Sequence, residues 1–164
     1  MKINIWALVV ILAFTFAALG QAKAPKGFDI RYDKFKDATS VSFGSYGTLI
    51  FERFGFDHKG TSLDQDQDEF YLMFTGTRAS CTGFCFKGGT DLILLIDGER
   101  VIAGTDGRLS DYVYFYVKRS LIEQLAAAKL VEYQVGRFEG KWEAKTLSKF
   151  KTLLDLGSVQ KPAR

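Results

Sequence analysis

The sequence predicts an α+β domain, made mostly of antiparallel β-sheet with two short helices near the C-terminus. Three observations favour this class. Short β-favouring runs broken by glycine occupy residues 28–56. An Asp-Gly pair separates two apolar runs within residues 91–103. After Ser120 the hydrophobic period lengthens to that of a helix. Strands are therefore expected first and helices in the C-terminal third.

The first residues have the order of a secretory signal. Lys2 precedes a nearly unbroken apolar run over residues 5–19, and small residues follow at Gly20 and Ala22. A retained anchor helix is the alternative, but the run is shorter than the roughly 20 apolar residues that span a bilayer core. We therefore expect a signal peptide over residues 1–22 and export to the periplasm or the medium.

The cleavage point stays open between three positions, after Gly20, Ala22 or Ala24. Pro25 would follow the last of these cuts, which makes that position the least favourable. No cysteine lies in this region to carry a lipid, so no stable membrane anchor is expected after cleavage.

The rest of the chain has the size and charge of one ordinary domain. Removing residues 1–22 takes away one basic residue, Lys2, and leaves 21 Lys and Arg against 19 Asp and Glu, a net charge of +2. This balance argues against a nucleic-acid partner, which requires a concentrated basic face. We expect a single globular domain over residues 23–157, with a loose tail over residues 158–164.

The first half of the domain predicts four strands and an acidic loop. Residues 57–69 are polar and acidic, and they form the predicted loop between the third and fourth strands. The strands are expected at residues 28–32, 40–43, 48–54 and 70–74.

Residues 91–103 predict a hairpin that turns at Asp97-Gly98. Both turn residues tolerate the positive φ of a type I′ turn. The first strand of the hairpin, residues 92–96, is apolar at every position. It is therefore expected in the centre of its sheet and buried on both faces.

Residues 112–117 predict a further strand with two aromatic or apolar faces. Tyr112, Tyr114 and Tyr116 alternate with valine and phenylalanine. We expect little solvent on either face. The tyrosine row could line a ligand-binding face, although aromatic strands more often serve packing.

The last third predicts two helices around a second hairpin. Ser120 and Glu123 have the spacing of a capping box, which predicts a helix from Ser120 through Ala128. Residues 131–142 alternate on both sides of Gly136-Arg137, as in a hairpin. Thr146 is expected to cap a final helix, and Gly157 to end it.

The two cysteines, Cys81 and Cys85, predict a structural disulfide. A closely spaced pair in an exported protein is most often bridged, and Gly83 lets the small ring close. A redox-active pair is the alternative, although the spacing is one residue longer than Cys-x-x-Cys. A zinc site is not expected, because two thiolates and one histidine fall short of four ligands.

An acidic run resembles the opening of a calcium loop, with carboxylates at Asp64, Asp66, Asp68 and Glu69. The sixth position of such a loop should be glycine and is Glu69, and the twelfth should be glutamate and is Thr75. A solvated acidic loop is the better interpretation. We expect no metal and no other cofactor.

No catalytic motif emerges from the spacing of polar residues. His58 is the only histidine, it lies in a polar stretch that suggests exposure, and no Gly-x-Ser-x-Gly elbow accompanies it. Asp91 and Asp97 remain a possible catalytic couple, because their separation is invisible in the sequence. The catalytic residues, the ligand-binding residues and the oligomeric state stay undetermined.

Three segments of the sequence, residues 32–39, 91–100 and 128–139, carry a resemblance that extends from about Phe28 to Leu156. In that order, the strand, the Asp-Gly hairpin and the Ala-Lys-Leu-Val-Glu segment resemble a family of small exported bacterial proteins of unassigned function. The resemblance implies export, bacterial origin and a shared fold. It implies nothing about chemistry.

Two functions are compatible with these patterns. The first is a non-enzymatic exported module that binds an envelope or extracellular partner, favoured by the lack of polar clusters at catalytic spacing. The second is an envelope or secreted enzyme that uses dispersed carboxylates or the pair Cys81 and Cys85. We favour the first, although active sites can be assembled by the fold from distant residues.

Overall fold

The computed structural model describes residues 24–46, 50–61, 66–77, 85–86, 88–106 and 110–158. The predicted signal peptide lies outside these residues, as does the predicted tail apart from Ser158. Two helices are described, α2 (Arg119–Ala127) and α3 (Ala144–Leu156).

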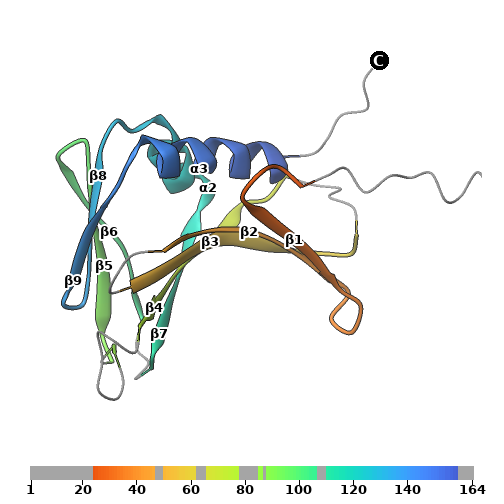
Figure 1. Cartoon of the computed structure of the whole chain (residues 1–164), viewed down its shortest axis with the longest axis horizontal. Coiled ribbons are helices and arrows are strands. Elements are labelled where there is room, and N and C mark those ends of the chain that lie inside the picture. Colours follow the sequence, from red (N-terminus) through yellow and green to blue (C-terminus); the bar gives the residue numbers. More distant parts are fainter. Residues whose placement is uncertain are drawn as a thin grey trace, which may run out of the picture.

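The strands form two antiparallel sheets (Figure 1). The five-stranded sheet has the order β1-β2-β3-β4-β7, with β1 (Phe28–Asp33), β2 (Ala38–Tyr46), β3 (Ile50–Lys59), β4 (Glu69–Gly76) and β7 (Tyr112–Lys118). The four-stranded sheet has the order β6-β5-β8-β9, with β5 (Thr90–Ile96), β6 (Glu99–Asp106), β8 (Val131–Val135) and β9 (Phe138–Trp142). The predicted α+β class is confirmed.

Both helices lie over one face of the five-stranded sheet, and the four-stranded sheet stands at its side (Figure 1). The two sheets meet where β6 runs beside β7. There the buried carboxylate of Asp106 accepts a hydrogen bond from the backbone N–H of Tyr114, at 2.9 Å. This side-chain bond connects the two sheets at their shared edge.

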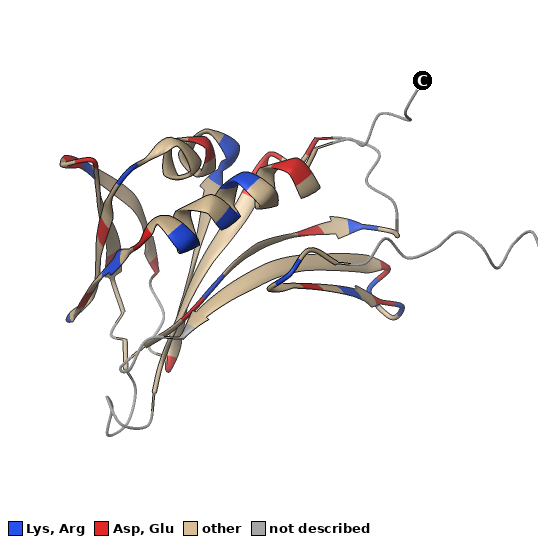
Figure 2. Ribbon diagram, turned by 45° about the horizontal axis from the view of Figure 1, so that its top comes forward, with Lys and Arg blue, Asp and Glu red and all other residues tan. Residues whose placement is uncertain are grey.

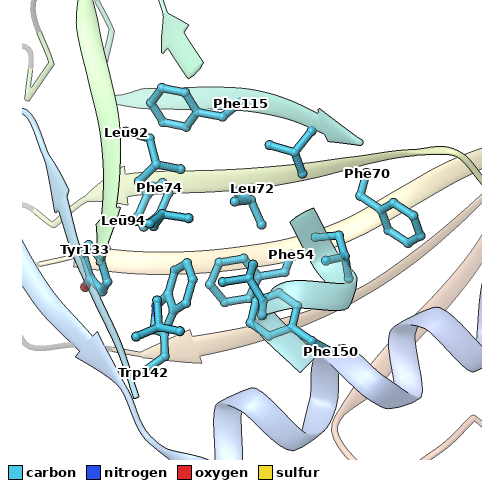
Figure 3. Close-up of a cluster of buried hydrophobic side chains, with 14 of the residues drawn as sticks. Phe54, Phe70, Leu72, Phe74, Leu92, Leu94, Phe115, Tyr133, Trp142 and Phe150 are labelled. Atoms are coloured by element: carbon cyan, nitrogen blue, oxygen red, sulfur yellow. The ribbon is translucent and has the colours of Figure 1, made fainter. Parts of the chain in front are cut away.

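The core fills the space between the helices and the two sheets. Phe54 of β3 contacts Trp142 of β9 and Phe150 of α3, each with ring centroids 5.1 Å apart (Figure 3). All three side chains are almost fully buried. Burying one such ring stabilises the fold by roughly 1.5–3 kcal/mol, so this aromatic cluster joins three elements that are distant in the sequence.

The first predicted hairpin is confirmed. Asp97 and Gly98 have φ values of 49° and 90°, as a type I′ turn requires. The Asp97 carboxylate also accepts hydrogen bonds from the backbone N–H groups of Lys129 and Leu130, each at 2.9 Å. The turn of one hairpin thereby fixes the entry to β8.

Neither predicted helix cap is present. Helix α2 begins at Arg119, one residue earlier than expected, and its N-cap residue is Lys118, with no side-chain capping bond. Helix α3 begins at Ala144 after Glu143, so Thr146 lies inside the first turn and does not cap it. Gly157 ends α3 as predicted, with its N–H bonded to the carbonyl of Leu153 at 2.9 Å.

The start of α2 is held by the side chain of Arg119. The guanidinium donates hydrogen bonds to the carbonyl oxygens of Gln67 and Gly157, at 3.1 and 3.3 Å, and to the Ser158 hydroxyl at 2.7 Å. It also pairs with Glu123 at 3.2 Å. One arginine therefore fastens α2 to the end of α3. Its backbone N–H donates a hydrogen bond to the carbonyl oxygen of Asp68, at 2.9 Å, so one donor of the first turn is satisfied without a capping side chain.

Two further expectations are wrong in detail. Strand β3 continues to Lys59, so the predicted acidic loop begins later than residue 57. Strand β5 is central, as predicted, but only one of its faces is fully buried. Ile93 is half-buried and Leu95 is exposed, because within the described residues no second layer covers the outer face of the four-stranded sheet.

Candidate functional site

The two faces of β7 meet different environments. Val113, Phe115 and Val117 are buried in the core. Tyr112 and Tyr116 are 44% and 66% exposed. The prediction that this strand meets little solvent is therefore wrong for its tyrosine face. In the described part of the chain the helices cover only the opposite side of the sheet (Figure 1).

The exposed tyrosines form a continuous row of rings with Tyr71. The rings of Tyr114 and Tyr116 are nearly parallel, with an interplanar angle of 16° and centroids 6.4 Å apart. Tyr112 and Tyr71 each meet Tyr114 edge-on, at 5.6 and 5.8 Å. We call Tyr71, Tyr112, Tyr114 and Tyr116 the tyrosine face.

Tyr71 fixes one end of the tyrosine face against the sheet. It lies opposite Gly55 in the pairing of β3 with β4, and a Cβ atom at Gly55 would lie only 2.7 Å from its hydroxyl oxygen. The absence of a side chain at Gly55 therefore lets the phenol cross β3. Its hydroxyl reaches β2, where it forms hydrogen bonds with Ser40 and Ser42. The Tyr71 side chain is 7% exposed, and it is anchored by its backbone in β4 and by its hydroxyl on β2.

Charged residues of both signs flank the tyrosine face. Asp29 forms ion pairs with Arg53 at 3.5 Å and with Arg31 at 3.7 Å. A groove of about 370 Å³ runs beside the rings. Its lining includes three basic and two acidic residues together with Ser40, Tyr71, Tyr114 and Tyr116; the charged ones are Arg31, Lys36, Arg53, Asp33 and Asp57.

Burial raises the pKa values of Tyr71 and Tyr114 above the ordinary value for tyrosine. For Tyr114, the neighbouring Tyr116 and Tyr112 add to the effect of burial. Both phenols therefore stay protonated at neutral pH and can donate hydrogen bonds. The groove combines neutral aromatic rings with fixed polar groups and holds little net charge.

A second polar group, Glu52, is buried on the other side of the same sheet. Its side chain is 4% exposed and shares the core with Tyr133 and Trp142. Burial raises the pKa of Glu52, while hydrogen bonds from Tyr133 and Ser45 and the nearby indole N–H of Trp142 oppose that shift. Burial, together with the hydrogen bond to Glu52, raises the pKa of Tyr133. Glu52 is not among the residues that line the groove beside the tyrosine face.

The predicted catalytic couple is not assembled. Asp91 and Asp97 lie at opposite ends of β5, six residues apart, which is about 20 Å along a strand. Asp91 accepts a hydrogen bond from the Thr105 hydroxyl at 2.5 Å, and Asp97 holds the backbone before β8. Both carboxylates serve the hairpin, so they carry no shared chemistry.

The other predicted site residues are scattered or only partly described. Cys81 lies outside the described residues, so the bridge to Cys85 stays a prediction; Cys85 is half-buried against the core. Asp64 also lies outside them, and no metal-binding group of three or more His, Cys, Asp or Glu occurs in the described part. His58 lies half-buried in β3, with its Nδ1 3.2 Å from the Lys59 carbonyl oxygen.

Sequence reasoning missed Arg53 and Tyr71 as members of the groove. A signal was present in the alternation of their strands. Ile50, Phe54 and Phe56 mark the inner face of β3, which places Arg53 on the outer face. What the alternation cannot show is that β7 lies beside β4, so that Tyr71 and the three later tyrosines share one surface.

A second groove, of about 470 Å³, lies on the outer face of the four-stranded sheet. Ile93 and Leu95 form its floor, with Arg100, Glu132 and Glu139 among the polar residues that line it. It has no cluster of exposed aromatic rings. The tyrosine face therefore remains the stronger candidate site.

No family model, no curated protein and no solved structure matches this chain. The resemblance drawn from the sequence thus stays a prediction. Among the described residues, neither helix is long and apolar enough to cross a membrane.

Proposed function

We propose that this protein is an exported, non-enzymatic binding module of the bacterial cell envelope, and that its ligand docks on the tyrosine face. The observation that carries the proposal is the row of Tyr112, Tyr114 and Tyr116 beside a groove with fixed polar groups. A tyrosine combines a large apolar ring with a polar tip and loses little conformational freedom on binding. Exposed tyrosines in mutual contact therefore suit recognition.

The arrangement of carboxylates favours binding over catalysis. Asp29, next to the groove, pairs with Arg31 and Arg53, and Asp33 accepts hydrogen bonds from the backbone N–H groups of Phe35 and Lys36. Asp91 and Asp97 are held apart by β5. An enzyme that uses the pair Cys81 and Cys85 is the second candidate function. Whether these two thiols are bridged or reactive distinguishes such an enzyme from a binding module.

Export is supported by Lys2, the apolar run over residues 5–19 and the small residues after it. The protein purified from cells that produce the full chain should have lost about 20 to 24 residues from its N-terminus. Intact-mass spectrometry measures this loss directly. An intact Met1 in a membrane fraction would contradict export with cleavage.

The pair Cys81 and Cys85 is expected to be bridged and structural. Thiol labelling of the denatured, non-reduced protein should find no free cysteine. Replacing both cysteines by alanine should cost no more than about 2–3 kcal/mol of unfolding free energy, because the ring is small. Ready labelling, or a reduction potential between about −270 and −120 mV, would favour a redox enzyme instead.

The binding proposal is tested by protein-detected NMR with a mixed library of small saccharides, aromatic fragments, phosphate and short peptides. Backbone shifts caused by binding should cluster on β7, β4 and the outer positions of β3. In Tyr116→Ala these shifts should weaken. Tyr32→Ala is the matched control, since Tyr32 is 45% exposed on the opposite face of the same sheet. Shifts that cluster on the groove of the four-stranded sheet would contradict the assignment.

A further inference from the structure

The ligand class can be narrowed from the chemistry of the tyrosine face. We infer that the groove takes an extended, uncharged oligosaccharide, with sugar rings stacked on Tyr114 and Tyr116. This inference rests on the proposed function, because it names the ligand of the same site. It depends on the orientation of the rings, the pairing of the charges and the placement of hydrogen-bonding groups.

Two nearly parallel tyrosine rings stand at alternate positions of β7. Tyr114 and Tyr116 deviate from parallel by only 16°, and Tyr116 is 66% exposed. They project from alternate positions of one strand, so the surface extends along β7. A sugar ring presents C–H groups on its faces and hydroxyls at its edge. Successive rings of an oligosaccharide can therefore lie along such a surface with their C–H groups against the tyrosines.

The pairing of the charges argues against an ionic ligand. Asp33 and Asp57 place two carboxylates in the lining of the groove. The carboxylate of Asp29 forms ion pairs with both Arg31 and Arg53 across β1 and β3. A phosphate or sulfate would have to compete with this carboxylate, and a cation would meet the arginines. Charges of both signs are also scattered over the strands and helices (Figure 2).

The polar groups that remain suit neutral hydroxyls. Ser40, the Tyr71 hydroxyl and the Asp57 carboxylate line the groove beside the rings. Carboxylates, phenols and serine hydroxyls can accept or donate hydrogen bonds to the edge hydroxyls of a sugar. Because Tyr71 is held by Ser40 and Ser42, this polar edge is already fixed before a ligand arrives. Preorganisation of this kind reduces the entropic cost of binding.

Isothermal titration calorimetry of the purified protein tests the inference. The probes are cellohexaose and hexa-N-acetylchitohexaose as neutral chains, a sulfated oligosaccharide and inorganic phosphate as anions, and trilysine as a cation. We expect a neutral chain to bind with a dissociation constant between about 10 μM and 1 mM. The binding should change little between low and high salt, since no ion pair with the ligand forms.

Two substitutions separate stacking from other contacts. Tyr116→Ala should weaken binding of the neutral chain at least about tenfold, whereas Tyr116→Phe keeps the ring and should stay within about threefold. Tyr32→Ala should bind as the wild type does. Circular dichroism of each variant shows whether the fold is retained, and NMR shifts from cellohexaose in the wild-type protein locate the bound sugar even if Tyr116→Ala fails to fold.

The outcomes distinguish this inference from the proposed function. Salt-sensitive binding of an anionic probe on the tyrosine face, without binding of either neutral chain, would overturn the oligosaccharide and leave the binding module standing. Binding of trilysine to the tyrosine face, without binding of either neutral chain, would have the same consequence. Failure of every probe and every library fragment to perturb the tyrosine face would overturn both.

Discussion

The two faces of the five-stranded sheet carry aromatic residues of different kinds. The inner face holds buried phenylalanines from four strands: Phe43, Phe54, Phe56, Phe70, Phe74 and Phe115. The outer face holds the tyrosine face. Phenylalanine has no polar group to satisfy and can be enclosed completely, while a phenol hydroxyl needs water or a partner. Most of the aromatic residues on the packed face are therefore phenylalanines, while the accessible face carries the row of tyrosines.

The largest expected difference between the faces is in stability. Phe54→Ala removes a ring that packs against Phe43, Trp142 and Phe150, and it should lower the unfolding free energy by about 3–5 kcal/mol. Tyr116→Ala, on the outer face, should change it by no more than about 0.5 kcal/mol. Urea denaturation measures both. Similar losses for the two variants would show that the outer face is also a packed surface.

A smaller effect is expected where the outer face is closely packed. Gly55→Ala places a methyl group against the carbonyl oxygen of Val41 and 2.8 Å from Cβ of Ser42. The substitution should cost about 1–3 kcal/mol and displace the Tyr71 ring. Gly104→Ala is the matched control, because its nearest contact is Phe115 at an ordinary 3.4 Å. Equal stability of the two variants would contradict the crowding of Gly55 by Val41, Tyr71 and Ser42.

The smallest effect concerns Glu52, the one buried acid of the inner face among the described residues. Burial raises its folded pKa above the unfolded value of about 4.3. Its contribution to stability is therefore fully present below about pH 4 and is lost as the pH rises through the folded pKa. Ser45, Tyr133 and Trp142, the groups that face it, do not titrate in that range.

Urea denaturation at several pH values compares the wild type with Glu52→Gln. The wild type should lose stability relative to the variant as the pH rises towards neutrality. The Glu52 carboxyl must then either ionise inside the core or keep a proton that the unfolded chain releases, and the variant has no such group. The exposed Glu132→Gln serves as the control and should show no such trend. A stability difference that is constant with pH would mean that Glu52 does not titrate differently in the folded protein.

Local patterns predicted most of the elements but not which faces are covered. The Asp97-Gly98 turn and both C-terminal helices follow from residues adjacent in sequence, so short-range chemistry was sufficient. In β7, valine and tyrosine both fit a buried strand. Only the position of the helices on one side of the sheet decides that Tyr116 is exposed. The same applies to Leu95, whose apolar neighbours predicted a second covering layer.

The helix caps show the opposite case, in which a local sequence pattern is present but the structure does not use it. Ser120 and Thr146 have the right chemistry for capping, yet neither caps a helix. The start of α2 is instead fixed by Arg119, whose partners Gln67 and Gly157 are 52 and 38 residues away. A pattern search along a few residues cannot detect bonds of that range. Similarly, the alternation of β3 placed Glu52 on the apolar face, but its partner Tyr133 comes from the other sheet.

Helix α2 begins at the residue that follows β7, with no loop between them. The number of residues at this junction therefore determines which side chains of α2 face the core. Each residue turns an α-helix by about 100°, so one inserted residue between Val117 and Arg119 would rotate Ile122 and Leu125 out of the core. A deletion within β7 would exchange the tyrosines with the buried valines. We therefore expect insertions and deletions to be tolerated in the turns but not at the junction between β7 and α2.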